Sequence, residues 1–121
     1  MGYLYYGNYA SYYEVGRVEA MRSLGVSYKE LEDSGIMMPV LDLKSTFVKP
    51  AYYDELLTVS TTILEMPQVR MYFGYEINNE GGEIINYGKT TLVFFDNARR
   101  KPCRPPQTLL DMLQPHFTKG N

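Results

Sequence analysis

The sequence has no tryptophan, a single cysteine and no apolar run near the ~20 residues that a membrane-spanning helix needs. The lone Cys103 cannot form an internal disulfide, which excludes a disulfide-stabilised scaffold and favours the reducing cytoplasm. A formal net charge of -2 gives no general electrostatic attraction to nucleic acid or to an anionic membrane. Ligand spacing typical of a metal site is also missing. We therefore expect a cytoplasmic protein without a metal or cofactor, and without a nucleic-acid or membrane partner.

The composition is otherwise that of a globular domain rich in tyrosine. With 121 residues, 45% of them apolar and 21% charged, the chain fits one domain over residues 1–121. Each of the twelve tyrosines combines an apolar ring with a polar tip. Such residues suit strands, core positions and half-buried interfaces.

A helical repeat dominates residues 8–24. Arg17 falls on a flank of this helix, and the inward face consists of Tyr9, Tyr12, Tyr13, Gly16, Ala20 and Leu24. Asn8 is expected to cap the start of the helix and Gly25 to end it. Because glycine lowers helix stability, Gly16 on the inward face predicts that another segment approaches the helix closely there.

A second, shorter helix is expected over residues 27–33. Ser27 followed by Glu30 three positions later is a capping box, in which each side chain satisfies a backbone N–H at the helix start. Gly35 is expected to end this helix.

Beyond this helix apolar residues recur at every second position, which is typical of half-buried strands. The expected strands cover residues 37–47, 56–66, 69–77 and 83–96. The last three are joined by short loops, including the glycine-containing loop at residues 78–82, and so predict an antiparallel meander. Since the long helix must bury its apolar face, the sequence predicts an α+β fold in which the sheet curls around one helix.

The C-terminal part differs in composition from the rest of the chain. Residues 99–106 are rich in basic residues and proline, which favours an exposed connector. Residues 108–113 predict a last helical turn, and residues 115–121 a frayed tail.

Four segments carry a further pattern. The first is Gly2-Tyr3-Leu4-Tyr5-Tyr6-Gly7-Asn8-Tyr9, which is followed by Tyr13, Glu14 and Arg17. The second covers residues 49–56, the third covers residues 87–90 and leads into residues 93–96, and the fourth covers residues 100–105. In this order they resemble hot-dog-fold acyl-CoA thioesterases of the 4-hydroxybenzoyl-CoA thioesterase type. The resemblance implies a hot-dog fold and hydrolysis of an acyl-CoA to a free acid and CoA. It also implies a homodimer or homotetramer with sites at the subunit interface.

The resemblance also concerns the start of the chain. In the family the catalytic carboxylate is an aspartate in a motif similar to Asp-x-x-Gly, just before the helix. Met1-Gly2 aligns with the end of that motif, so we expect the aspartate two residues before Met1 and the first strand of the fold further upstream. We therefore expect that this chain is truncated or wrongly started. Tyr6 stands where many relatives carry histidine.

The candidate site lies at the helix start. Thioester hydrolysis needs a donor for the developing oxyanion, and the first N–H groups of a helix lack intrahelical partners. We assign this role to the backbone N–H groups of Tyr6 and Gly7; the alternative is an ordinary capped helix start. Neighbouring and basic residues are assigned to substrate binding, the latter for the CoA phosphates: Asn8, Tyr9, Tyr13, Lys89, Arg99, Arg100 and Lys101. For the cations the alternative is a solvated basic loop.

No carboxylate of the chain is assigned as the base. Glu14 lies roughly 9–12 Å along the helix axis from Tyr6 at ~1.5 Å per residue, which is too far to serve the same carbonyl within one subunit. Asp54 and Glu55 are read as turn residues, and a Cys103–His116 nucleophile pair remains a weaker alternative. The sequence thus predicts an acyl-CoA thioesterase. The alternative is a non-hydrolytic acyl-CoA-binding or scaffolding protein of the same fold.

Overall fold

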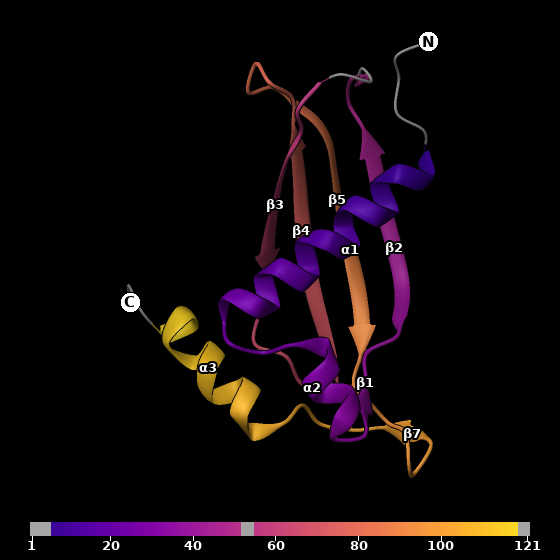
Figure 1. Cartoon of the computed structure of the whole chain (residues 1–121), viewed down its shortest axis with the longest axis vertical. Coiled ribbons are helices and arrows are strands. Elements are labelled where there is room, and N and C mark those ends of the chain that lie inside the picture. The colour runs from indigo at the N-terminus through magenta and orange to yellow at the C-terminus, as the bar shows by residue number, and fades with distance from the viewer. Residues whose placement is uncertain (1–5, 52–54, 119–121) are drawn as a thin grey trace.

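The computed structural model describes residues 6–51 and 55–118 (Figure 1). Within these residues the elements are, in order, α1 (Tyr6–Ser23), α2 (Tyr28–Asp33), β1 (Ile36–Met37), β2 (Val40–Phe47), β3 (Thr58–Ile63), β4 (Arg70–Asn78), β5 (Ile84–Val93), β6 (Phe95–Asp96), β7 (Lys101–Pro102) and α3 (Gln107–Thr118). None of the helices in the described part of the chain is long and apolar enough to cross a membrane.

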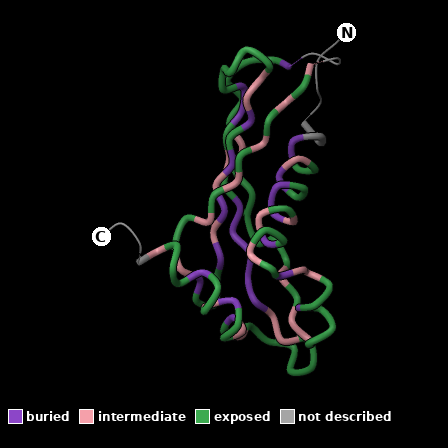
Figure 2. Tube along the Cα trace, turned by 60° about the vertical axis from the view of Figure 1, so that its left-hand side comes forward, coloured by how far each residue is buried: buried purple, intermediate pink, exposed green. Residues whose placement is uncertain are grey.

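An antiparallel sheet in the order β2-β5-β4-β3 forms the body of the structure, and a small sheet in the order β1-β6-β7 extends it at one end. The predicted meander of β3, β4 and β5 is confirmed by their pairing. The long helix α1 runs across one face of the larger sheet (Figures 1 and 2). This is the predicted arrangement of a sheet curled around one helix.

The predicted ends of the first two helices are largely confirmed. Gly25 adopts a φ of 87°, and the N–H of Val26 reaches back to the carbonyl of Met21 at 3.0 Å, as in a Schellman motif. The capping box of Ser27 and Glu30 is present at α2. The prediction for Asn8 is wrong, because α1 begins at Tyr6 and places Asn8 inside its first turn. An N-cap preference is worth only ~1 kcal/mol and does not by itself decide where a helix starts.

Five further boundaries differ from the sequence prediction. The first predicted strand divides at Pro39 into β1 and β2, and β3 is shorter than expected. The last strand divides at Phe94 into β5 and β6, and β7 turns part of the predicted connector into a hairpin against β6. The predicted tail is helical as far as Thr118, because apolar residues at helical spacing, with Leu109 and Leu113 buried, anchor α3 through its internal Pro115.

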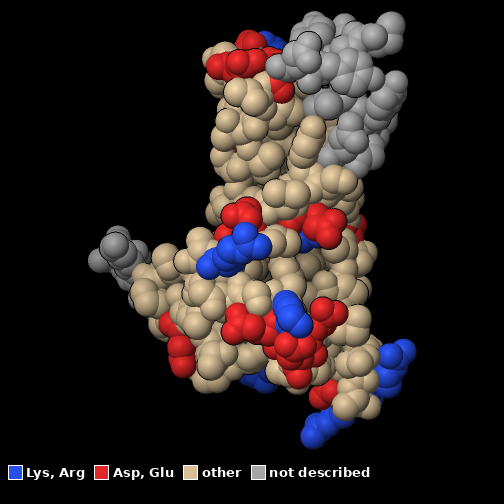
Figure 3. Space-filling view, in the orientation of Figure 1, with Lys and Arg blue, Asp and Glu red and all other residues tan. Residues whose placement is uncertain are grey.

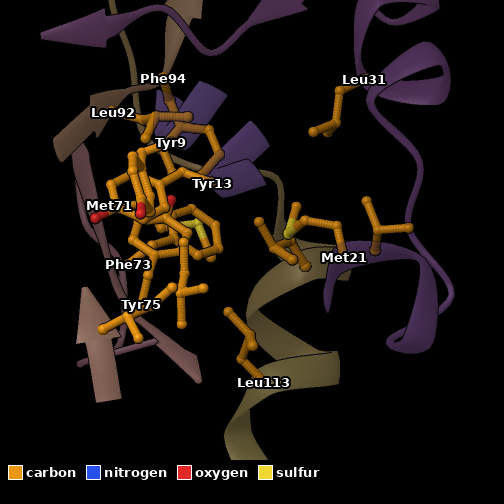
Figure 4. Close-up of a cluster of buried hydrophobic side chains, with 14 of the residues drawn as sticks. Tyr9, Tyr13, Met21, Leu31, Met71, Phe73, Tyr75, Leu92, Phe94 and Leu113 are labelled. Carbon is orange, nitrogen blue, oxygen red and sulfur yellow. The ribbon is translucent and has the colours of Figure 1, made fainter. Parts of the chain in front are cut away.

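The core lies between α1 and the sheet (Figure 4). On β4 every second residue is buried, namely Met71, Phe73, Tyr75 and Ile77, as the alternation predicts. Met21 of α1, Leu31 of α2 and Leu113 of α3 belong to the same cluster, so the helices share one core with the sheet.

Polar side chains inside this core fix α1 on the sheet. The Tyr13 hydroxyl donates to Asn86 Oδ1 on β5 and lies 3.0 Å from Ser45 Oγ on β2. The Tyr13 ring stacks on Tyr75 of β4 with 4.2 Å between centroids. Tyr13 is fully buried, and burial raises the pKa of its hydroxyl, so the neutral donor form is maintained.

Arg17 adds a second polar anchor. The sequence places it on a flank, but the structure buries it to 9% exposure, so that prediction is wrong. Its Nη1 donates to the Tyr75 hydroxyl at 3.2 Å, and that hydroxyl lies 2.6 Å from Thr90 Oγ1 on β5. A hydroxyl on a distant strand thus gives the guanidinium a partner that the local pattern does not reveal.

The predicted close approach at Gly16 is confirmed. A Cβ built at this position would overlap Thr61 Oγ1 and lie 3.3 Å from Val59 Cγ1, both on β3. Glycine is therefore required where α1 crosses this edge strand.

Replacing Gly16 with valine should lower the free energy of unfolding by about 1–3 kcal/mol, because the added carbons collide with Thr61. Urea unfolding measures the change. Gly81→Val is the matched control: a Cβ there meets only an ordinary contact at 3.5 Å, so the change should be about 0.5 kcal/mol or less. Equal stability of the two variants would contradict the close approach.

Replacing Tyr13 with phenylalanine should also cost about 1–3 kcal/mol, because Asn86 Oδ1 loses its donor while it stays buried. Tyr12→Phe, which removes a hydroxyl at a partly exposed position of the same helix, serves as the control. If both variants unfold at the same urea concentration as the wild type, the Tyr13 hydroxyl does not anchor α1.

Candidate active site

The start of α1 supplies hydrogen-bond donors without any special side chain. Tyr6 and Gly7 are its first two residues, and the first four N–H groups of a helix have no partner within the helix. The helix dipole adds positive potential at this end. Both features favour an oxygen that gains negative charge, such as the carbonyl oxygen of a thioester under attack.

Aromatic side chains pack the first turns of α1 against the end of β2. Tyr9 is 3% exposed, and its ring meets the Phe47 ring nearly at right angles with 4.9 Å between centroids. Tyr12 meets Tyr9 edge-on at 6.1 Å. Burial raises the pKa of Tyr9, and the nearby Tyr12, Tyr13 and Glu55 act in the same direction. The wall beside the helix start is therefore aromatic, and burial keeps the Tyr9 hydroxyl neutral.

Glu55 is a carboxylate whose charge affects Tyr9 in the first turns of α1. The charge of Glu55 acts to raise the pKa of Tyr9, and the residue is partly buried. The sequence predicts a turn residue at this position, and no local pattern distinguishes it. Glu14 is exposed, and its charge is the smallest of the contributions to the pKa of Tyr28, which burial raises to about 12. Asp54 lies outside the described residues.

The predicted binding residues of α1 differ in position. Tyr9 and Tyr13 are buried in the core, so any effect of theirs on a substrate passes through the position of the helix. For Asn8 the structure describes the backbone, which lies in the first turn of α1.

The predicted cations do not gather at the helix start. Lys89 projects from the face of the sheet opposite α1, and its Nζ lies 5.1 Å from the centre of the Tyr72 ring. Arg99, Arg100 and Lys101 lie on the β6–β7 hairpin, at the end of the molecule away from the start of α1 (Figures 1 and 3). Within one chain the structure therefore separates the predicted phosphate-binding cations from the predicted oxyanion donors.

The basic hairpin is nevertheless an ordered feature. The Asp96 carboxylate accepts hydrogen bonds from the N–H groups of Ala98 and Arg99, both at 3.0 Å. The Arg100 guanidinium lies over the Phe95 ring at 5.8 Å and donates to Asn97 Oδ1 at 3.3 Å. These contacts fix the backbone of the hairpin, while the side chains of Arg99, Arg100 and Lys101 remain exposed.

The alternative nucleophile pair gains no support. Burial, followed by the charge of Asp96, raises the pKa of the Cys103 thiol, which disfavours the reactive thiolate. His116 is exposed on α3.

Comparison with known proteins identifies the family. A family model described as the Thioesterase superfamily matches residues 1–86. YneP of Bacillus subtilis (strain 168), provisionally named an acyl-CoA thioesterase, is 32% identical over 104 residues, which are 86% of this chain and 75% of YneP. The structure of DHNA-CoA thioesterase from Staphylococcus aureus is 35% identical with a TM-score of 0.86, over 98% of this chain and 79% of that one.

A hypothetical protein of Staphylococcus aureus, solved in complex with CoA, is similar in fold alone. Its TM-score is 0.89 at 15% identity, over 100% of this chain and 77% of that one. These similarities confirm the predicted hot-dog fold. The chain belongs to the Thioesterase superfamily.

Proposed function

We propose that the protein hydrolyses an acyl-CoA thioester to a free acid and CoA at the N-terminal end of α1. Membership of the Thioesterase superfamily supports this activity. The proposed position of the active site rests on one observation: α1 starts at Tyr6, which leaves the N–H groups of Tyr6 and Gly7 without helical partners.

The chemistry requires attack by water on the thioester carbonyl. The water oxygen bonds to the carbonyl carbon, a carboxylate takes the water proton, and the carbonyl oxygen becomes an oxyanion. The N–H groups of Tyr6 and Gly7 stabilise that oxyanion. The C–S bond then breaks, and the thiolate of CoA leaves and takes up the proton. The core anchors at Tyr13 and Arg17 hold these N–H groups in place through α1.

A second copy of the chain completes the proposed site, in a homodimer or homotetramer. Within the described residues β2 is an edge strand, and it carries exposed apolar side chains: Leu41 and Leu43 along its length, and Phe47 beside the first turns of α1. Such a stripe on an unpaired strand edge suits pairing with a second copy. In that assembly Arg99, Arg100 and Lys101 of one chain serve the CoA phosphates at the helix start of the other. The single free cysteine, Cys103, suits the cytoplasm as the compartment.

The alternative is a protein that binds an acyl-CoA without hydrolysing it. No feature of the described residues favours this alternative over hydrolysis. The two functions differ in whether CoA thiol is released.

The first test is thiol release from a panel of acyl-CoAs that includes short-chain, long-chain and aromatic acyl groups and 1,4-dihydroxy-2-naphthoyl-CoA. The last is included because a relative of known structure is a DHNA-CoA thioesterase. We expect turnover well above the uncatalysed rate for at least one member. Saturable binding of an acyl-CoA without thiol release would replace hydrolysis by the binding function.

The second test removes one oxyanion donor. Gly7→Pro deletes the N–H of residue 7, and the first turn of a helix tolerates proline because that N–H has no helical partner. The value of kcat should fall by about 10²–10³, with little change in stability. Gly7→Ala is the matched control because it adds a side chain but keeps the N–H, and it should retain most of the activity. Equal activity of both variants would place the oxyanion donor elsewhere.

A further inference from the structure

Phe47 is an exposed aromatic side chain that lies beside the first turns of α1. It is the last residue of β2, and its ring meets the Tyr9 ring nearly at right angles with 4.9 Å between centroids. Tyr9 is 3% exposed, whereas Phe47 is 40% exposed. A buried ring thus supports a second ring whose surface is open to a ligand.

The Phe47 ring lies close to the proposed oxyanion donors. Tyr9 follows Tyr6 by three residues, which is about 4.5 Å along the helix axis. Helical side chains lean toward the N-terminus, so the Tyr9 ring, and Phe47 in contact with it, lie beside the first N–H groups of α1. Figure 1 shows the first turns of α1 crossing β2 near the end of that strand.

A thioester bound at these donors has two substituents, the acyl group and the CoA arm. Its carbonyl oxygen lies about 3 Å from a donor nitrogen, so both substituents begin within a few ångströms of the helix start. The CoA arm carries amides and phosphates, which need polar partners, whereas Phe47 offers an apolar surface. The acyl group is therefore the substituent that fits beside Phe47.

The charges around this ring disfavour an acyl group that carries a carboxylate. Burial raises the pKa of Tyr9, and the negative charge of Glu55 acts in the same direction. Lys49 follows Phe47 by two residues, but its ammonium group is paired with the Glu83 carboxylate. A carboxylate beside Phe47 would thus meet an apolar ring and a negative charge, while the nearby cation already has a partner.

We propose that Phe47 is a specificity-determining residue of the acyl-CoA site and that it selects uncharged, apolar acyl groups over acyl groups with a carboxylate. This inference rests on the proposed function at the start of α1 and adds a substrate class to it. Phe47 acts by contact with the acyl group, because its hydrocarbon ring neither takes up nor releases a proton.

The test compares two acyl-CoAs of nearly the same shape, 4-methylpentanoyl-CoA and succinyl-CoA. In succinyl-CoA a carboxylate replaces the branched methyl end of the acyl chain. We expect the full wild-type chain to favour 4-methylpentanoyl-CoA about tenfold or more in kcat/KM, because the surroundings of Phe47 oppose the carboxylate. The ratio of the two Kd values measures the same preference without turnover.

Replacing Phe47 with arginine places a cation on this wall. The preference should fall by about tenfold, mainly because succinyl-CoA gains a charge-assisted hydrogen bond. Tyr87→Arg is the matched control and should leave the preference unchanged. Tyr87 is an aromatic residue of β5 that is 49% exposed, and it faces away from α1 because its neighbour Gly88 faces Tyr13.

Phe47→Leu is a milder variant that keeps the wall apolar but removes the ring. It should lower the preference about threefold through the smaller apolar contact. Thermal unfolding shows whether each variant remains folded, and the leucine variant decides if the arginine variant does not fold.

Two results would overturn the role of Phe47. One is a wild type that prefers succinyl-CoA. The other is a Phe47→Arg variant, or a Phe47→Leu variant in its place, that keeps the wild-type preference. A wild type that releases no thiol but binds the two compounds with the expected preference would instead overturn hydrolysis and leave the role of Phe47 supported.

Discussion

The contact between α1 and the sheet is the constraint on which the rest of the structure depends. At Gly16 the helix passes so close to β3 that a single Cβ would collide with Thr61. This closeness brings the Tyr13 hydroxyl to Asn86 and the Arg17 guanidinium to Tyr75. Because buried polar groups must find partners, these bonds admit one position of the helix along the sheet and oppose sliding or rotation.

The proposed chemistry depends on that position. Backbone donors cannot be adjusted by choosing a rotamer, so the place of the Tyr6 and Gly7 N–H groups is the place of the helix itself. The anchors at Tyr13 and Arg17 lie two and three turns into the helix, well inside the core, while the start of α1 lies at its end. The core thus sets the geometry of a site to which it contributes no reacting group.

Local patterns in the sequence predict the features that depend on local physics. The alternation of β4, the capping box at Ser27 and the stop at Gly25 follow from preferences within a few residues, and all three are confirmed. Gly16 predicts a close approach because glycine is costly inside a helix, although the sequence does not name Thr61 as the neighbour. Features that depend on distant partners are missed: Arg17 is buried because Tyr75 lies opposite it, and β7 forms because β6 is available to pair. For the site, the helix start follows from the pattern and the resemblance, whereas the electrostatic effect of Glu55 on Tyr9 has no local signal in the sequence.

The separation of the basic hairpin from the start of α1 has a genetic consequence. In the proposed assembly each site takes its oxyanion donors from one chain and its phosphate-binding cations from the other. A chain damaged at the helix start and a chain damaged at the hairpin would each be inactive as pure assemblies. Mixed pairs would contain one site with both defects and one site with neither. Two defective alleles could therefore complement each other in one cell, and selection would act on the pair rather than on the single chain.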